Sequence, residues 1–249
     1  MISENIRLNS GYFLLKLRSE QELPEMHPGQ FVQIQIENSS ETFLRRPISI
    51  HYVDPAKNEI WLLIQIAGAG TAHLSRLKSG DRLNIIAPLG SHFTFPDQTD
   101  NVLLIGGGVG IAPLLFFGIK LREKGIQPNF LLGARTANDL LQMDEFGRCG
   151  EINTTTEDGS CGEKGFVTHH SCLQTQQYNR IYTCGPKPMM LAVARYAKEK
   201  DYFCEVSLEN RMACGIGACL CCVEKTVKGN VCVCTEGPVF NINQLTWPI

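Results

Sequence analysis

Six of the eleven cysteines in this 249-residue chain lie in residues 212–240, which read MACGIGACLCCVEKTVKGNVCVCTEGPVF. Within this segment, Cys214, Cys219 and Cys222 follow a C-x4-C-x2-C pattern, and further cysteines come later. This is the ligand spacing of plant-type [2Fe–2S] clusters. The glycines at 215 and 217 and Ala218 favour the same interpretation, because they let the backbone wrap closely around a cluster and offer N–H groups to its sulfurs. The segment therefore predicts an iron–sulfur centre.

Two other uses of clustered cysteines fit the spacing less well. A four-cysteine zinc site usually pairs two C-x2–4-C knuckles, and the second knuckle here, Cys232-x-Cys234, is too tight. A disulfide framework is unnecessary in a chain of this size, and the remaining cysteines are scattered and odd in number. The spacing leaves the fourth ligand open among Cys221, Cys232 and Cys234.

The composition limits the function classes. A hydrophobic content of 43% and a charged content of 19% are typical of a globular protein with substantial cores. The net charge of −2 gives no reason to expect nucleic acid or an anionic membrane as a partner. The N-terminus lacks the pattern of a signal peptide, and the uncharged run Val102–Ile119 is short and interrupted by glycines and Pro113. We therefore expect a cytoplasmic protein that does not span a membrane.

Residues 1–97 show short strand patterns separated by turns rich in glycine and proline. Such a series without a long helical period favours an antiparallel barrel or sandwich. The predicted strands are Tyr12–Leu17, Phe31–Ile36, Ile60–Ile66 and Arg82–Ile86.

Two stretches within this region suit a phosphate-bearing ligand. Residues 46–49 read RPIS, and an arginine close to a hydroxyl on a stiff strand suits a pyrophosphate or a polar ring edge. Residues 68–71 read GAGT after a strand, with Thr71 predicted as the N-cap of a helix, and bare backbone at a helix N-terminus binds anions. Each stretch alone also fits an ordinary strand or a flexible turn.

From residue 101 the pattern changes to that of a βαβ unit. A buried strand at 102–105 runs into the loop GGGVGIAP at 106–113, followed by a helix at 114–124 and a strand at 129–133. This loop resembles a dinucleotide-binding loop, although Pro113 occupies the third glycine position. Its candidate cofactor-binding residues are Gly107, Gly108 and Gly110.

The residue expected to select the nucleotide is also unusual. No acidic residue follows the second strand, and Arg135 occupies that region. Because an arginine suits a 2′-phosphate, both NAD and NADP remain possible from the residues alone.

A second loop of the same kind follows the strand predicted at 180–183. Residues 184–190 read CGPKPMM and precede a helix predicted at 191–200 and a last strand at 204–208. Such a crossing places bare backbone at the carboxyl edge of a parallel sheet, where ligands bind. Its candidate cofactor-binding residues are Cys184, Gly185 and Pro186.

A chain with both a nucleotide-binding region and an iron–sulfur centre requires a further cofactor. A nicotinamide transfers two electrons as a hydride and a [2Fe–2S] cluster takes one, so a flavin is needed to connect them. The N-terminal barrel is the module left to hold it. The predicted architecture is a β-barrel FAD domain (1–97), a Rossmann-like α/β NAD domain (98–203) and a [2Fe–2S] subdomain (204–249). No acid–base pair or activated nucleophile is predicted, because His169–His170 and Glu157–Asp158 fit surface loops.

These motifs resemble those of the electron transfer subunit of B-type dihydroorotate dehydrogenase, a family within the ferredoxin–NADP reductase superfamily. The similar stretches run in order along the whole chain, and the cysteine segment is the most specific. They are RPIS at 46–49, GAGT at 68–71, GGGVGIAP at 106–113, CGPKPMM at 184–190 and residues 208–222 with the closing CTEGPVF at 234–240.

The resemblance implies roles for individual residues. Residues that would hold FAD are Arg46, Pro47, Ile48, Ser49, Leu63, Ile64, Gln65, Gly70 and Thr71. Ligands of the cluster would be Cys214, Cys219, Cys222 and Cys234. The family pairs this subunit with an FMN-containing catalytic subunit in a heterotetramer of two copies of each. Electrons from dihydroorotate would pass from FMN through the cluster and FAD to NAD+, in pyrimidine biosynthesis.

Other readings remain open at this point. The same modules could serve another partner, such as a ferredoxin or a sulfide or polysulfide reductase, as an NAD(P)H-linked subunit. A zinc-stabilised adaptor without redox activity is the alternative from a different class. The resemblance favours NAD over NADP.

Overall fold

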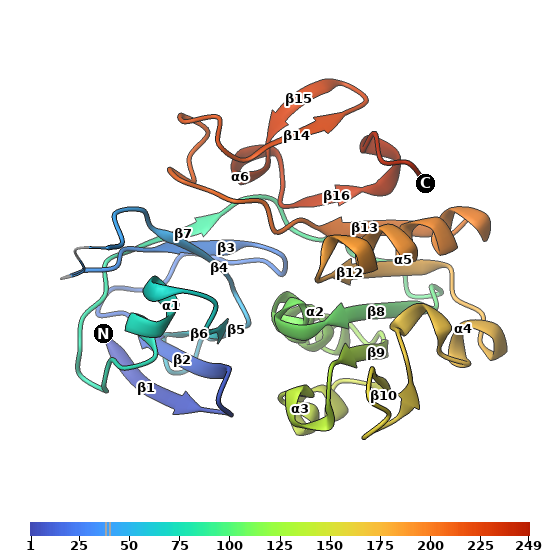
Figure 1. The fold of residues 1–249 in the computed structure, drawn as a ribbon, viewed down its shortest axis with the longest axis horizontal. Helices are drawn as coiled ribbons and strands as arrows, with labels where there is room; N and C mark the ends of the chain where they lie inside the picture. Colours follow the sequence, from blue (N-terminus) through green and yellow to red (C-terminus); the bar gives the residue numbers. More distant parts are fainter. Residues whose placement is uncertain (38, 40) are drawn as a thin grey trace.

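A computed structural model of the chain describes residues 1–37, 39 and 41–249 (Figure 1). Its strands are β1 (Ile2–Arg7), β2 (Tyr12–Arg18), β3 (Phe31–Ile34), β4 (Arg46–Ser49), β5 (Tyr52–Asp54), β6 (Glu59–Gln65), β7 (Ile85–Leu89), β8 (Val102–Gly107), β9 (Asn129–Ala134), β10 (Glu151–Thr156), β11 (Glu163–Lys164), β12 (Arg180–Cys184), β13 (Phe203–Ser207), β14 (Val223–Thr226), β15 (Gly229–Cys232) and β16 (Val239–Asn241). Its α-helices are α1 (Ala69–Leu74), α2 (Ala112–Glu123), α3 (Met143–Gly147), α4 (Cys172–Thr175), α5 (Lys187–Glu199) and α6 (Val233–Glu236).

The N-terminal part consists of two antiparallel sheets, β1-β2-β6-β5 and β4-β3-β7. Alternate residues of their strands, such as Leu15, Val32 and Leu62, are fully buried in one shared core, as the period of two predicts. The predicted strand at 82–86 is displaced, because β7 begins at Ile85. The preceding turn extends further than expected because the Asp81 carboxylate accepts a hydrogen bond from the Lys78 N–H at 2.7 Å.

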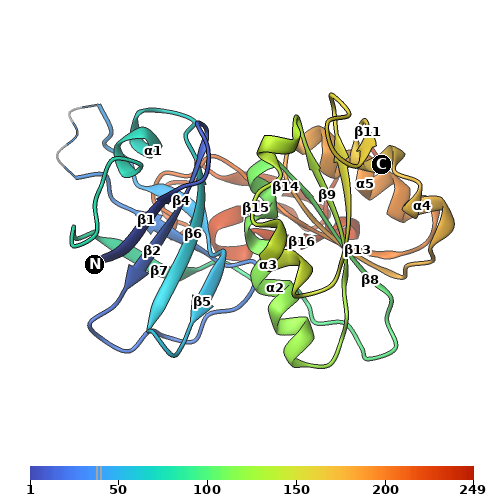
Figure 2. The same cartoon turned by 90° about the horizontal axis from the view of Figure 1, so that it is seen from below.

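The second part is a mainly parallel sheet of order β11-β10-β9-β8-β12-β13-β16, in which only β16 runs antiparallel to its neighbour. Helix α2 and α3 cover one face, and α4 and α5 cover the other (Figure 2). Strand β8 is buried on both faces, as predicted: Leu104 packs on the α2 side and Leu103 on the α5 side. Within residues 1–37, 39 and 41–249, no helix is both long and apolar enough to cross a membrane.

The two nucleotide-loop helices begin earlier than the sequence patterns indicate. Helix α2 starts at Ala112 and α5 at Lys187, with Pro113 and Pro188 in their first turns. A proline is tolerated there because the first N–H groups of a helix have no partner within the helix. Pro113 and Pro188 therefore lie inside the first turns of these helices and not before them.

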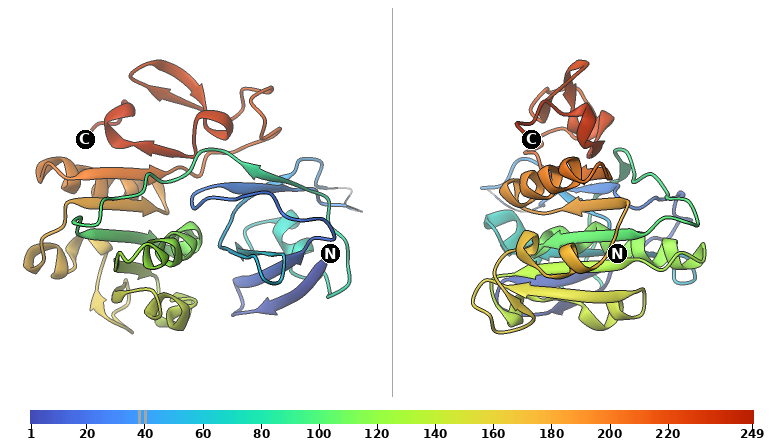
Figure 3. Two further views of the ribbon diagram at one scale, coloured as in Figure 1. Left: turned by 180° about the vertical axis from the view of Figure 1, so that it is seen from behind. Right: turned by 90° about the vertical axis from the view of Figure 1, so that its right-hand side faces the viewer.

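The C-terminal segment leaves the parallel sheet after β13, forms the hairpin β14–β15 and helix α6, and returns as β16 (Figure 3). It covers the outer side of both larger parts, near β7 of the barrel and β13 of the sheet (Figure 1). Strand β16 pairs with β13, with Val206 opposite Phe240. The cysteine segment is thus framed by two strands of the same sheet.

Barrel and sheet meet along α2, whose Phe116 is buried in the barrel core. His51, which follows β4, is fully buried at this junction, and its Nδ1–H donates to the Ala112 carbonyl oxygen at 2.8 Å. Burial lowers the pKa of His51 to about 4, an effect that the hydrogen bond to Ala112 opposes. The junction therefore contains a neutral imidazole.

This burial predicts a pH dependence of stability. Because the unfolded imidazole has the ordinary pKa of 6.5, the unfolded state binds more protons than the native state between pH 6.5 and about 4. The free energy of unfolding should therefore fall as the pH drops through this window, by about 3 kcal/mol at pH 4 from this residue. Urea unfolding of wild type and His51→Gln at a series of pH values measures it. Equal losses in both proteins would contradict the prediction.

Candidate functional site

The thiols of the cysteine segment differ in their exposure to solvent. Its inner side packs in the core that it shares with the parallel sheet and with Phe31 of the barrel. The thiols range from buried (Cys222 and Cys234) through intermediate (Cys214 and Cys232) to exposed (Cys219 and Cys221). The segment is therefore anchored on its inner side and accessible on its outer side.

Three backbone N–H groups point at cysteine sulfurs. The N–H of Ile216 donates to Cys214 Sγ with an N–S distance of 3.4 Å, and that of Gly217 donates to Cys234 Sγ at 3.1 Å. The N–H of Cys234 donates to Cys222 Sγ at 3.4 Å. Thiolate and sulfide sulfurs of a cluster are acceptors of such bonds. The backbone of the segment therefore fits an iron–sulfur cluster.

The thiol of Cys214 lies beside that of Cys219, and the thiol of Cys222 lies beside those of Cys234 and Cys232. The pKa of Cys214 is lowered to about 6 by the Ile216 N–H and by hydrogen bonding with Cys219. The pKa of Cys234 is raised to about 12 by burial and by a hydrogen bond with Cys222. Nowhere in residues 1–37, 39 and 41–249 do three or more His, Cys, Asp or Glu side chains form a group that could hold a single metal ion. Pairs of thiolates suit two irons, each bound through two cysteines.

The two late cysteines differ in their surroundings. Cys232 Sγ lies 3.9 Å from the carbonyl oxygen of Gly217, which suits a thiol that keeps its proton. Cys234 Sγ instead receives the N–H of the same residue. Cys234 Sγ is therefore better placed than Cys232 Sγ to accept a backbone hydrogen bond as a cluster ligand.

On the barrel, β4 lies beside the start of α1. The four residues of β4, Arg46–Ser49, are half-buried. A Cβ atom added to Gly70 would lie 2.7 Å from Arg46 Nε, so the guanidinium packs directly on the backbone of α1. Next to them, the buried Thr42 hydroxyl has no hydrogen-bond partner in the described part of the chain. An arginine and an unpaired hydroxyl beside bare backbone fit an anionic group of a flavin cofactor.

The prediction that Thr71 is an N-cap is wrong. Helix α1 begins at Ala69 with Gly68 as the N-cap. The Thr71 hydroxyl reaches back and accepts hydrogen bonds from the N–H groups of Ala67 at 2.9 Å and Gly68 at 3.2 Å. The hydroxyl thus holds the turn before the helix.

The strand β6 connects the barrel site to the nucleotide loop. The side chains of Leu63 and Ile64 are buried in hydrophobic cores, so they offer a ligand only their backbone. Gln65 is exposed, and its Nε2 donates to the Tyr12 hydroxyl at 3.2 Å. A Cβ atom on Gly108 would lie 3.9 Å from this same hydroxyl. The end of β6 and the loop after β8 therefore face each other.

The two predicted nucleotide loops touch. Strands β8 and β12 are parallel neighbours, with Gly106 opposite Cys184. A Cβ atom on Gly110 would lie 2.4 Å from Gly185 Cα, and one on Gly107 would lie 3.3 Å from Pro186 Cδ. Only glycine permits this approach, which brings both loops together at the carboxyl edge of the sheet.

One residue at this edge, Glu209, was missed in the sequence. Its Oε1 lies 3.9 Å from the buried Cys184 Sγ, whose pKa burial raises well above the ordinary range. Glu209 lies two residues after the end of β13, and its position after a parallel strand was the available signal. A cavity of about 140 Å³ adjoins it, lined by Gly185, Lys187, Met190, Leu208, Glu209, Asn210, Glu224 and Trp247.

The two residue pairs predicted to lie in surface loops, Glu157–Asp158 and His169–His170, differ in their burial. Glu157 and Asp158 are exposed, and so is Arg135 after β9. The prediction that His169–His170 is a surface loop is wrong for His170, which is buried. Its Nδ1 accepts a hydrogen bond from the Cys172 N–H at 3.0 Å and so holds the start of α4.

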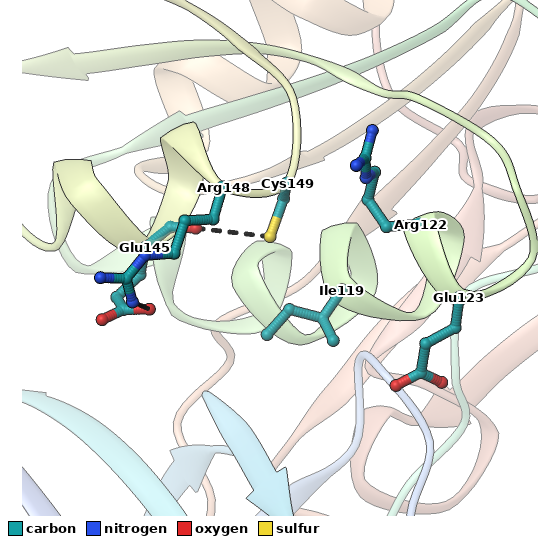
Figure 4. A pocket seen from close by; sticks show the side chains of 6 residues that line it. All are labelled: Ile119, Arg122, Glu123, Glu145, Arg148 and Cys149. Atoms are coloured by element: carbon teal, nitrogen blue, oxygen red, sulfur yellow. Dashed lines mark hydrogen bonds and ion pairs between the residues drawn. The ribbon is translucent and has the colours of Figure 1, made fainter.

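Another pocket, open to solvent, lies between α2 and α3 (Figure 4). Its lining contains none of the predicted site residues. The lining residues are Ile119, Arg122, Glu123, Glu145, Arg148 and Cys149. The lining side chains carry two positive and two negative charges. Arg148 Nη1 forms an ion pair with Glu145 Oε2 at 2.8 Å.

Comparison with protein families divides the chain in the same order. The oxidoreductase FAD-binding domain matches residues 1–94, and the oxidoreductase NAD-binding domain matches residues 104–195. The iron–sulfur cluster binding domain of dihydroorotate dehydrogenase B matches residues 209–246. These matches confirm the predicted fold class.

One solved structure is similar over almost the whole chain. It is that of an NADH-dependent reduced ferredoxin–NADP oxidoreductase, at 29% identity and a TM-score of 0.88, covering 99% of this chain and 89% of the other. The cytochrome b5 reductase domain of Ulva prolifera nitrate reductase shares the fold at 16% identity and a TM-score of 0.68, over 81% and 91% of the two chains.

Curated relatives carry the name dihydroorotate dehydrogenase B (NAD(+)), electron transfer subunit. The one from Listeria monocytogenes serotype 4b is 40% identical over 229 residues, covering 89% of this chain and 88% of its own. That from Clostridium perfringens is 38% identical over 243 residues, covering 96% and 94%. The resemblance predicted from the motifs is confirmed: the chain belongs to the family of electron transfer subunits of dihydroorotate dehydrogenase B.

Proposed function

We propose that this chain carries electrons between an FMN-containing dihydroorotate dehydrogenase subunit and NAD+, in pyrimidine biosynthesis. The observation that supports this most directly is that the barrel contacts both other modules. Tyr12 of the barrel faces Gly108 of the nucleotide loop, and Gln33 of the barrel lies against Gly215 of the cysteine segment. Three redox modules in contact suit an electron carrier.

The cofactors are FAD, a [2Fe–2S] cluster and NAD(H). When bound, the flavin exchanges electron pairs with nicotinamide and single electrons with the cluster, which serves the partner subunit. The protein's task is to hold these groups close together and to exclude competing reactions. We assign residues 1–97 to FAD, 98–203 to NAD and 204–249 to the cluster.

Individual roles follow from the contacts. Arg46 would neutralise the flavin pyrophosphate at Gly70, and Ser49 lies on the same strand. FAD binding would further involve Pro47, Ile48, Leu63, Ile64, Gln65 and Thr71. Nucleotide binding would involve Gly107, Gly108, Gly110, Cys184, Gly185 and Pro186. Cluster ligation would involve Cys214, Cys219, Cys222 and Cys234.

The outer rim of the cysteine segment suits a partner subunit. Ile216 and Leu220 are 59% and 66% exposed, and they lie on either side of the exposed Cys219. Apolar side chains displayed next to a redox centre are typical of a protein contact. We assign this rim to the catalytic subunit, in a heterotetramer of two copies of each chain, located in the cytoplasm.

Anaerobic titration of the purified chain with NADH tests the function, with flavin and cluster absorbance followed separately. We expect FAD, two irons and two acid-labile sulfides per chain, and reduction by NADH in preference to NADPH. Colourless protein containing zinc would contradict the proposal. Co-purification with a ferredoxin or sulfide-oxidising protein, and not a dihydroorotate-oxidising flavoprotein, would assign the same machinery to another partner.

Cys222→Ser should separate the two halves of the electron path. We expect loss of electron flow to the partner, because a cluster ligand is removed from the buried side of the segment. Reduction of FAD by NADH should persist, because the nucleotide loops are unchanged. Rapid-mixing measurement of flavin bleaching checks this, and slow bleaching in the variant would contradict it.

The two late cysteines offer a matched comparison. Cys234→Ser should lower the acid-labile sulfide content, because Cys234 receives the Gly217 N–H, whereas Cys232→Ser should retain wild-type sulfide. Sulfide and iron analysis of both variants measures this. The reverse pattern would assign the fourth ligand to Cys232.

Arg46→Lys should weaken FAD binding about tenfold, because a lysine lacks the planar fork of donors that suits a pyrophosphate. Fluorescence titration of the deflavinated protein with FAD measures the Kd. Arg45→Lys is the control, since Arg45 donates instead to Asn84 and Gln35. Unchanged affinity in Arg46→Lys would exclude this role.

A further inference from the structure

Gln33, in the middle strand of the barrel sheet β4-β3-β7, has a fully buried side-chain amide without a partner. Its relative exposure is 0%, and neither Oε1 nor Nε2 makes a hydrogen bond within residues 1–37, 39 and 41–249. Its backbone is engaged, because its carbonyl oxygen accepts from Arg45 Nη1 at 3.4 Å. A buried amide without a hydrogen bond is unfavourable, so native proteins pair such groups. The unpaired amide therefore indicates a binding partner.

The geometry of β3 shows which way this amide faces. Val32 and Ile34 are buried in the barrel core, whereas Phe31 is buried in the core that contains Cys222 and Cys234. Successive side chains on a strand point to opposite faces. Gln33 therefore shares the face of Phe31, which is turned toward the cysteine segment.

The amide touches the backbone of that segment. A Cβ atom on Gly215 would lie 2.7 Å from both Cγ and Nε2 of Gln33 and 3.0 Å from Cδ. Gly215 has a φ of +74° and follows Cys214 directly. The glycine thus allows a barrel side chain to approach the first turn of the segment, within the stretch that joins Cys214 to Cys219.

We propose that Gln33 is a positioning residue of the cluster site, whose amide N–H donates to a sulfur beside Cys214. This inference rests on the proposed function, because it requires that the segment holds a [2Fe–2S] cluster. A hydrogen bond to a cluster sulfur stabilises the reduced, more negative form and so raises the reduction potential. Gln33 would thus make the potential of the cluster depend on the flavin domain, although it supplies no ligand.

The test uses the loaded full-length chain with Gln33→Leu, which removes the polar atoms at similar volume. At a fixed ambient potential we expect the ratio of reduced to oxidised cluster to fall about tenfold, a shift of about 59 mV for one electron. EPR-monitored redox titration measures this ratio. The flavin potential should stay unchanged. Gln33→Met, which has a similar volume but no hydrogen-bond donor, should shift the potential in the same direction.

Gln35→Leu is the matched control on the same stretch of chain. Gln35 is exposed, and its Oε1 accepts from Arg45 Nη2 at 3.1 Å, so the potential of the cluster should remain that of wild type. If Gln33→Leu fails to incorporate the cluster, the reduction potential measured in Gln33→Met is the deciding result. An unchanged cluster potential in the Gln33 variants, or a shift confined to the flavin, would overturn the inference. A wild-type chain without the cluster would overturn the proposed function itself.

Discussion

Ser91 and Val239, 148 residues apart, are joined by two hydrogen bonds: the Ser91 hydroxyl donates to the Val239 carbonyl oxygen and accepts from the Val239 N–H, both at 3.2 Å. Ser91 lies at the end of the barrel, and Val239 begins β16 of the parallel sheet. On the other side, the Leu208 N–H donates to the Pro238 carbonyl oxygen at 2.9 Å. Barrel, sheet and cysteine segment are thus fixed to one stretch of backbone. This stretch therefore helps to set their relative placement, together with the α2 junction.

The closest backbone approaches, within modules and between them, occur where side chains are absent. Gly110 lies against Gly185 in the nucleotide loops, Gly70 against Arg46 in the barrel, and Gly215 against Gln33 at the cysteine segment. Each position excludes a Cβ atom at distances of 2.4 to 2.7 Å. Because electron and hydride transfer both require closely held cofactors, small residues at these contacts serve the chemistry as well as the packing.

The sequence was informative where the signal is local. The spacing of Cys214, Cys219 and Cys222 and the glycine-rich loop after residue 105 are contiguous patterns, and the fold class follows from strand and helix periods. Contacts between distant residues left no such pattern. The unpaired amide of Gln33 could not be predicted, because it depends on how separate modules pack. Thr71 was misplaced because a threonine hydroxyl can hold a helix start from either side of it.

Strand β16 also has a protective role. Without β16, β13 would be an edge strand of the sheet. Its unpaired backbone N–H and C=O groups could then pair with another chain. Yet β16 lies beyond the cysteines, so the chain must traverse the whole cysteine segment before it can cap its own sheet. A chain that ended before β16 would therefore leave the sheet open at β13.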